Sequence, residues 1–200
     1  MSSPGFITSM VQLEQPLICV DPVKEMLDIA IKNEIPNIET ICESAEQFSQ
    51  RDIRYDKLLI KGTIHHFPVN KLRQIFSGIS KQLSKSGIIL IEKTPGTQQT
   101  KGYPSFEKAL KLHSQLFSGL TDILVNLLRD LGFEVSSTIV GGKRKISKVE
   151  AIDNIRNRYT STLGLLSDQE IQAGIEEVDR NFGDVIEYEQ NREMLIAVKL

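Results

Sequence analysis

Apolar residues along the chain follow two patterns, short continuous runs and longer stretches in which they recur every three or four positions. Short runs bounded by turn formers predict strands buried on both faces, here at 17–20, 37–42, 55–62, 88–91, 133–140 and 194–198. Helical spacing is clearest over 69–83, and further helices are predicted after Asp21, over about 105–131 and within 147–183. The chain therefore alternates strand and helix.

Boundary residues support these elements. Asp21 and Pro22 suit the N-cap and first position of a helix, and Ser167 with Glu170 forms a capping box. Gly87 suits a left-handed helix C-cap before the strand at 88–91, and the pair Gly141-Gly142 predicts a sharp turn after the strand at 133–140.

Alternating strands and helices predict an α/β sheet with helices on both faces and right-handed crossovers. No composition shift divides the chain, so we expect a single domain, 1–200, in which the polar helical segment 147–183 is an insertion or lid. Ligands of such sheets bind beyond the carboxyl ends of the strands, and Asp21 lies at one of these ends.

Composition narrows the function classes. With 24 basic and 26 acidic residues in 200, the net charge of -2 provides no field for nucleic acid or an anionic membrane. Cys19 and Cys42 stand in apolar runs without metal-ligand spacing, which favours reduced thiols and no metal. No apolar window approaches a membrane span, so we expect a cytoplasmic protein whose partner is a small molecule.

Four stretches, in order between residues 17 and 93, together resemble the class I S-adenosylmethionine-dependent methyltransferases, in particular the small-molecule group called type 11. They are ICVDPVKEML, CESAEQF, YDKLLIKGTIHHF and IFSGISKQLSKSGIILIEK. The resemblance implies a Rossmann-like sheet, S-adenosylmethionine as cofactor and a small-molecule methyl acceptor. It covers less of residues 94–200, which match only as the expected later helices and strands.

The beginning of the chain departs from this family. Of the glycine-rich turn that follows the family's first strand, only Gly5 stands at the corresponding position. The expected fold is therefore an N-terminally truncated methyltransferase sheet. Without that central strand, the strands near Cys19 and Ile60 would have unpaired edges, at about 1–3 kcal/mol for each unpaired buried group. Either the sheet closes differently or the chain is a fragment or short isoform.

The resemblance also assigns site residues. It implies that the Asp21 carboxylate binds both ribose hydroxyls, although the same residue could be a plain helix cap. The cofactor-binding residues that it implies are Gly5, Asp21, Pro22, Ser44, Ala45 and Lys61. Ser44 stands where many relatives carry an aspartate, so a hydroxyl would contact the adenine, and Lys61 ends the strand that faces the methionine part of the cofactor.

Substrate contacts are expected from His66, in the loop after the strand at 55–62, and from Tyr103. The neighbouring residues His65 and His66 would point to opposite sides of an extended segment, which argues against a shared metal ion. Arg156, Arg158 and Tyr159 in the expected lid are further candidates. No residue is predicted to be catalytic, because methyl transfer mainly needs alignment.

Two other functions remain open. A truncated, non-catalytic binding or dimerisation module is favoured by the absent glycine turn. An oxidoreductase with a nicotinamide cofactor would share the acid after the strand at 17–20, but it does not explain the CESAEQF and YDKLLIKGTIHHF segments. The sequence predicts neither the oligomeric state nor the methyl acceptor.

Overall fold

The computed structural model describes residues 16–32, 37–95 and 105–200. Contacts between Cα atoms divide the chain into two compact units. Unit 1 comprises 1–91, 127–135 and 196–200, and unit 2 comprises 92–126 and 136–195. The predicted site residues Gly5 and Tyr103 lie outside the described residues.

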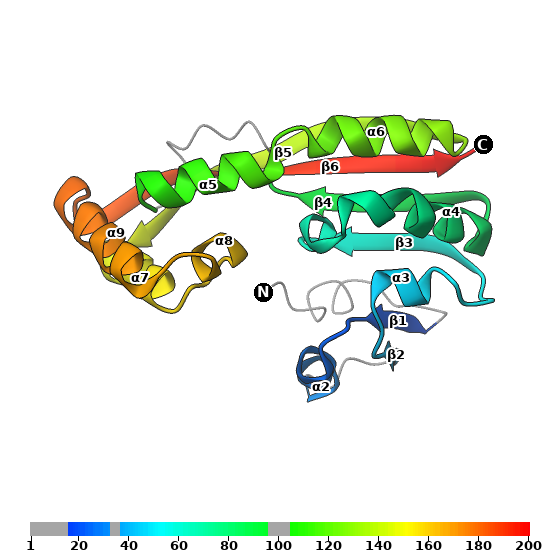
Figure 1. Ribbon diagram of the computed structural model, residues 1–200, viewed down its shortest axis with the longest axis horizontal. Helices are drawn as coiled ribbons and strands as arrows, with labels where there is room; N and C mark the ends of the chain where they lie inside the picture. Colours follow the sequence, from blue (N-terminus) through cyan, green and yellow to red (C-terminus); the bar gives the residue numbers. More distant parts are fainter. Residues whose placement is uncertain (1–15, 33–36, 96–104) are drawn as a thin grey trace. The chain divides into compact units, whose positions relative to one another are not determined.

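The elements alternate as the sequence predicts (Figure 1). In chain order they are β1 Leu17–Val20, α2 Lys24–Lys32, β2 Ile38–Ile41, α3 Ala45–Phe48, β3 Tyr55–Lys61, the 3₁₀ turns η1 Ile64–His66 and η2 Val69–Lys71, α4 Leu72–Gln82, β4 Leu83–Lys93, α5 Glu107–Phe117, α6 Leu120–Asp130, β5 Phe133–Ser147, α7 Lys148–Arg156, α8 Ser161–Gly164, α9 Asp168–Asn181 and β6 Val185–Lys199. The strands form a parallel β1-β2 pair and a four-stranded sheet ordered β3-β4-β6-β5. The predicted α/β class is confirmed.

In unit 1 the amphipathic helix α4 covers β3 and β4 (Figure 1). Its buried apolar residues are Leu72, Ile75, Phe76 and Ile79, and the strands contribute Ile60, Ile89 and Ile91. Each such side chain contributes about 1.5–3 kcal/mol when fully removed from water. The helix predicted for 69–83 exists, but its first turn is 3₁₀ and Val69 is 63% exposed, so the buried stripe begins at Leu72.

Two glycines predicted to end elements lie within strands instead. Gly87 is in β4, where a Cβ would approach Leu83 Cδ2 to 2.8 Å, and Gly141 is in β5, where it would approach the Asn191 side chain to 2.2 Å. Both predictions of a cap or turn are wrong, because these glycines permit close packing rather than a reversal of the chain.

Other boundaries also differ from the prediction. The helix expected over 105–131 is two helices, α5 and α6, separated at Gly119, whose φ of 73° is left-handed. The last strand is longer than 194–198, since β6 begins at Val185.

The capping box of Ser167 and Glu170 is confirmed: the Glu170 N–H donates to Ser167 Oγ at 3.4 Å and the Ser167 N–H donates to Glu170 Oε2 at 2.7 Å.

The segment 147–183 is helical, as predicted. Its helices α7, α8 and α9 share an apolar core in unit 2, formed with Phe106 and Ala109; its members from the segment are Ala151, Ile155, Leu163, Leu166, Ile171 and Val178. Whether the segment acts as a lid on a single domain stays a prediction. Among the described residues, no helix has the length and apolar character that crossing a membrane requires.

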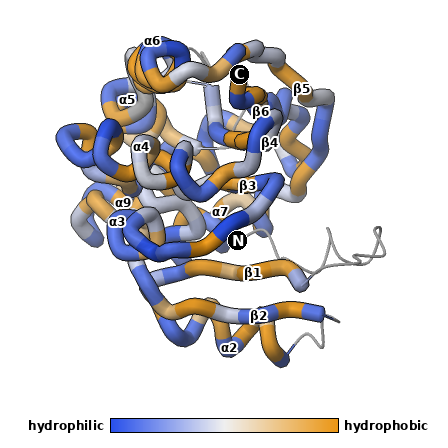
Figure 2. Tube along the Cα trace, turned by 90° about the vertical axis from the view of Figure 1, so that its right-hand side faces the viewer, coloured by the Kyte–Doolittle hydropathy of each residue, from blue (hydrophilic) through white to orange (hydrophobic). Residues whose placement is uncertain are grey.

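Within the described ranges, the strands β1 and β2 form a sheet of their own, which shares no strand with the four-stranded sheet. Orange, the colour of apolar residues, dominates along β1 in Figure 2, yet Ile18 is 37% exposed. In the described part of the chain, β1 pairs with β2 and β3 pairs with β4, and neither has a partner on its other side. Those are the edges that the sequence analysis expected to lack a neighbour.

Candidate functional site

The carboxyl ends of β1 and β2 lie together because the strands are parallel and in register, with Val20 opposite Ile41. Past the strands, the backbone N–H of Asp21 donates to the Ile41 carbonyl at 3.3 Å. The Cys42 thiol donates to the Pro22 carbonyl at 3.7 Å. The loop after β1 is thus held against the loop after β2, as the position of a ligand site in such sheets requires.

The Asp21 carboxylate closes the turn that follows β1. Its Oδ1 accepts the Val23 N–H at 2.8 Å, and α2 begins only at Lys24. The prediction that Asp21 is the helix N-cap is therefore wrong by two residues: its carboxylate caps an Asx turn that leads into the helix. In the described part of the chain, Oδ2 has no hydrogen-bond partner, which leaves one oxygen of the carboxylate for a ligand.

Ser44 is the N-cap of α3. Its Oγ accepts the Gln47 N–H at 3.2 Å while Gln47 Oε1 accepts the Ser44 N–H at 2.9 Å. Ala45 is the first helical residue, and an N–H at this position has no acceptor within its helix. The sequence analysis missed this capping box, although SAEQ carries its S-x-x-Q signature. A ligand can still receive the Ser44 hydroxyl proton, since the cap uses only the oxygen.

Ion pairs fix the loop around Ser44. The Arg51 guanidinium donates to both carboxylate oxygens of Glu43, at 2.7 and 2.8 Å, and lowers the pKa of Glu43. The Lys71 ammonium lies 3.0 Å from Glu46 Oε1. A bidentate pair sets orientation as well as distance, so the start of α3 is held from both sides.

At the end of β3, Lys61 is partly buried and Gly62 has a left-handed φ of 65° with open space where a Cβ would be. His65 and His66 follow in the 3₁₀ turn η1, with ring centroids 3.9 Å apart and planes tilted by 46°. The prediction that these rings point to opposite sides is wrong, because the segment is helical rather than extended. Among the described residues no cluster of three His, Cys, Asp or Glu side chains is placed to hold a metal ion.

A buried ion pair in unit 2 was not predicted. The Lys93 ammonium, with a fully buried side chain, lies 2.7 Å from Glu193 Oε2. Thr121 donates to the same oxygen at 2.9 Å, and Ser137 donates to Oε1 at 3.1 Å. Burial alone would raise the pKa of Glu193, but the hydrogen bonds from these groups outweigh it and the pKa is lowered. Lys93 lies on the buried face of β4 together with Ile89 and Ile91, because alternate residues of a strand face the same side. The sequence analysis did not predict its burial, because a lysine is usually exposed.

The expected substrate residues of the lid have structural contacts instead. Arg158 Nη1 donates to the Leu163 and Leu166 carbonyls at 2.6 and 2.5 Å, and Nη2 donates to Asp168 at 2.6 Å. Arg156 is paired with Asp153. Arg158 thus fastens the end of α8 to the start of α9, and Tyr159, 57% exposed, keeps an accessible ring.

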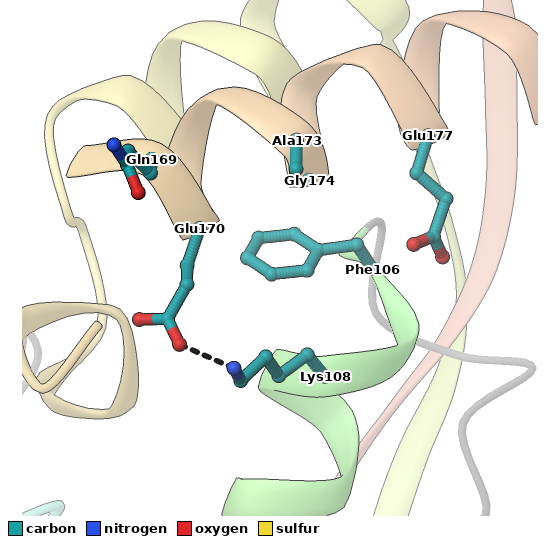
Figure 3. Close-up of a pocket in the computed structure, with 7 residues that line it drawn as sticks. All are labelled: Phe106, Lys108, Gln169, Glu170, Ala173, Gly174 and Glu177. Atoms are coloured by element: carbon teal, nitrogen blue, oxygen red, sulfur yellow. Dashed lines mark hydrogen bonds and ion pairs between the residues drawn. The ribbon is translucent and has the colours of Figure 1, made fainter. Parts of the chain in front are cut away.

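Two surface hollows are lined by residues other than the predicted cofactor residues. One, of about 280 Å³, is lined by α9 and the start of α5, with the Phe106 ring against Gly174 and Lys108 paired with Glu170 (Figure 3). The Lys108 ammonium and the Ser167 N–H lower the pKa of Glu170 to about 2.

The other hollow, of about 590 Å³, is lined by the segment 49–54, which follows α3, and by α4. Its floor includes Gln82, whose Nε2 donates to the Phe48 and Arg51 carbonyls at 2.8 and 2.9 Å and whose Oε1 accepts from Tyr55 at 2.9 Å. Burial raises the pKa of Tyr55. The lining of neither hollow includes Asp21, Ser44 or Lys61, so the role of these residues in cofactor binding stays a prediction.

Comparison with known proteins agrees with this fold. Residues 3–87 match the model of a methyltransferase domain. No curated protein matches the sequence with significance. The structure resembles the YcgJ protein from Bacillus subtilis with a TM-score of 0.60 and 15% identity, over 92% of this chain and 82% of that one.

Two further structures are similar. The cyclopropane synthase MmaA2 from Mycobacterium tuberculosis has a TM-score of 0.54 and 14% identity, over 94% and 71% of the two chains. A phosphoethanolamine N-methyltransferase from Haemonchus contortus, in complex with S-adenosylhomocysteine, has a TM-score of 0.51 and 16% identity, over 91% and 43%. The match over residues 3–87 agrees with the resemblance seen in the sequence, and these solved structures share the fold of this chain.

Proposed function

We propose that the chain binds S-adenosylmethionine at the carboxyl ends of β1 and β2 and transfers its methyl group to a small molecule. The observation that carries the proposal is the joining of the two loops: the Asp21 N–H donates to the Ile41 carbonyl, and Cys42 contacts Pro22. This contact places a carboxylate and the N-terminus of α3 at one end of the same pair of strands.

The residues present fit a nucleoside. Asp21 Oδ2 can accept a ribose hydroxyl proton while Oδ1 stays in the turn. The Ala45 N–H and the Ser44 hydroxyl are donors for nitrogen acceptors of an adenine ring, and Pro22 offers an apolar surface beside it. At the end of β3, Gly62 leaves room for the rest of the cofactor, because nothing lies within 4 Å of where its Cβ would be.

The bound cofactor would supply an electrophilic methyl group on a good leaving group, the sulfonium. The chain's own residues would then contribute by positioning the methyl donor and the acceptor. Asp21 and the start of α3 orient the donor, and His66, exposed in η1, is the proposed contact with the acceptor. Alignment of two reactants is worth up to about 7–11 kcal/mol of a barrier, which explains why the proposal needs no nucleophilic residue.

Calorimetric titration with S-adenosylmethionine tests the proposal. We expect micromolar binding by the chain and a loss of at least tenfold in affinity (about 1.4 kcal/mol) in Asp21→Ala. Binding should be unchanged in the control Asp28→Ala, because Asp28 is a partly buried aspartate of the same region that is paired with Lys24. A chain that binds no cofactor at millimolar concentration while its circular dichroism is that of a folded protein would contradict the proposal.

The second candidate, a non-catalytic binding or dimerisation module, has one observation in its favour: in the described part of the chain β1-β2 is separate from the four-stranded sheet. A two-stranded sheet is a weak platform for a tight cofactor site. This candidate predicts a folded chain without cofactor binding, the result that contradicts the first proposal.

A further inference from the structure

Strand β5 is an edge strand with an unusual degree of exposure. In the four-stranded sheet it pairs with β6 alone among the described residues. All residues from 136 to 145 are exposed, including Ile139 at 60% and Val140 at 49%. An exposed edge presents a row of N–H and C=O groups that another strand can pair with, unless charges, proline or a short length block it.

The residues that usually block such pairing are absent from the middle of this edge. Between 135 and 142 the sequence VSSTIVGG has no charged residue and no proline. Charges occur only toward the ends, at Glu134 on one side and at Lys143, Arg144 and Lys145 on the other. Lys145 is paired with Glu187 of β6, whereas within the described residues Glu134 and Arg144 form no ion pair.

These charges are arranged symmetrically about one residue. Glu134 precedes Ile139 and Arg144 follows it by the same number of positions. In an antiparallel pair of identical strands centred on Ile139, each residue before the centre lies opposite the corresponding residue after it. Glu134 of each copy is then opposite Arg144 of the other, and both lie on one face because they are an even number of residues apart.

We propose that the outer edge of β5 pairs with β5 of a second copy, antiparallel and centred on Ile139, to form a homodimer. A second copy places an opposite charge beside both Glu134 and Arg144, since the two-fold axis repeats the Glu134–Arg144 pair. An unrelated strand would have to bring a basic residue to one end and an acidic residue to the other. Gly141 and Gly142 lie opposite Ser137 and Ser136 and place no bulky side chain between the strands.

The dimer is expected to be weak and concentration-dependent, because one pair of edge strands buries less surface than a standard interface. The dimer does not depend on cofactor binding. A result that contradicts the cofactor site therefore does not contradict the dimer, and the reverse also holds.

Cysteine cross-linking tests the register. At the centre of the pair, position 139 faces itself, within reach of a disulfide, whereas two copies of position 138 are diagonal neighbours about 7–8 Å apart. We expect Ile139→Cys to give an intermolecular disulfide under mild oxidation and the control Thr138→Cys to give at least about tenfold less. Peptide mass spectrometry separates this bond from disulfides of the native Cys19 and Cys42. Equal cross-linking at both positions would overturn the register.

Charge reversal tests the end pairs by sedimentation velocity over about 10 μM to 1 mM protein. In Glu134→Arg or Arg144→Glu, like charges oppose each other and the dissociation constant should rise at least about tenfold at low salt. The double variant restores opposite charges and should dimerise as the native chain does. Thermal unfolding of each variant shows whether it is folded. A native chain that stays monomeric at the highest concentration, or a folded double variant as weak as the single variants, would refute the dimer.

Discussion

At the scale of single residues, the ion pair of Lys93 and Glu193 in unit 2 is buried, with side-chain exposures of 0% and 10%. Removal of one partner leaves the other charge buried, which costs about 3–5 kcal/mol in comparable cases. Lys93→Met should therefore lower the free energy of unfolding by about that amount in urea titration. The exposed pair of Arg73 and Asp130 is the control, because surface pairs contribute about 0–1 kcal/mol. A loss below about 1 kcal/mol in Lys93→Met would show that water reaches the pair.

The same pair predicts a pH dependence. The folded-state pKa of Glu193 is lowered from its ordinary value of 4.5, so its contribution to stability is present above that pH and is lost as pH falls through the folded pKa. Urea titrations of the native chain between pH 7 and acid pH should show this loss. Glu193→Gln, which cannot ionise, should be less stable at neutral pH and should have a flatter profile below pH 4.5. A profile as steep as the native one would assign the acid sensitivity to other carboxylates.

At the scale of elements, the packing of α3 against α4 depends on Gly78. A Cβ there would lie 2.1 Å from the Ser49 carbonyl oxygen, a backbone atom that cannot rotate away. Gly78→Ala should destabilise the chain by at least about 1–3 kcal/mol despite the better helix propensity of alanine, which is worth only about 1 kcal/mol. Gly164→Ala in α8, where nothing lies within 4 Å, is the matched control. Equal unfolding midpoints in the two variants would contradict this packing.

Helix capping gives a second element-scale prediction. Ser167 begins α9 with a reciprocal capping box, so Ser167→Ala should cost about 0.5–2 kcal/mol. Ser118, whose N–H donates to Ser114 at the end of α5, has a backbone role only in the described contacts, and Ser118→Ala should change little. Thermal unfolding of both variants measures the difference. A loss confined to Ser118→Ala would reverse the assignment.

At the scale of the whole molecule, the two sheets should differ in local stability. Within residues 16–32, 37–95 and 105–200, β1 and β2 each have one strand neighbour, whereas β4 is flanked by β3 and β6. Amide hydrogens of 17–20 and 38–41 should exchange at least about tenfold faster than those of 88–91, as measured by mass spectrometry. S-Adenosylmethionine should slow exchange in the first set if it binds there. Similar protection in both sheets without ligand would indicate that β1-β2 is supported by more than its own pairing.

Much of this fold could be predicted because the signals were local. Apolar periodicity placed α4, S-x-x-E placed the start of α9, and the order of four short stretches indicated the methyltransferase fold. Local reasoning failed where a distant segment decides the outcome. Gly87 and Gly141 look like turn residues, but each is a place of close approach: Gly87 to Leu83 and Ser84 of its own strand, and Gly141 to Gln190 and Asn191 of β6. His65 and His66 look extended, but a 3₁₀ turn brings their rings together at a tilt.

The sequence by itself determined the alternation of strands and helices, the acid that follows β1 and the family resemblance, since each rests on residues close together in the chain. Only the tertiary structure decided which side chains meet. Lys93 and Glu193 are far apart in sequence and form one buried pair, and the Asp21 N–H meets the Ile41 carbonyl only because β1 and β2 are parallel and in register. The physical reason is that pairing of strands and burial of charge depend on partners that no local pattern specifies.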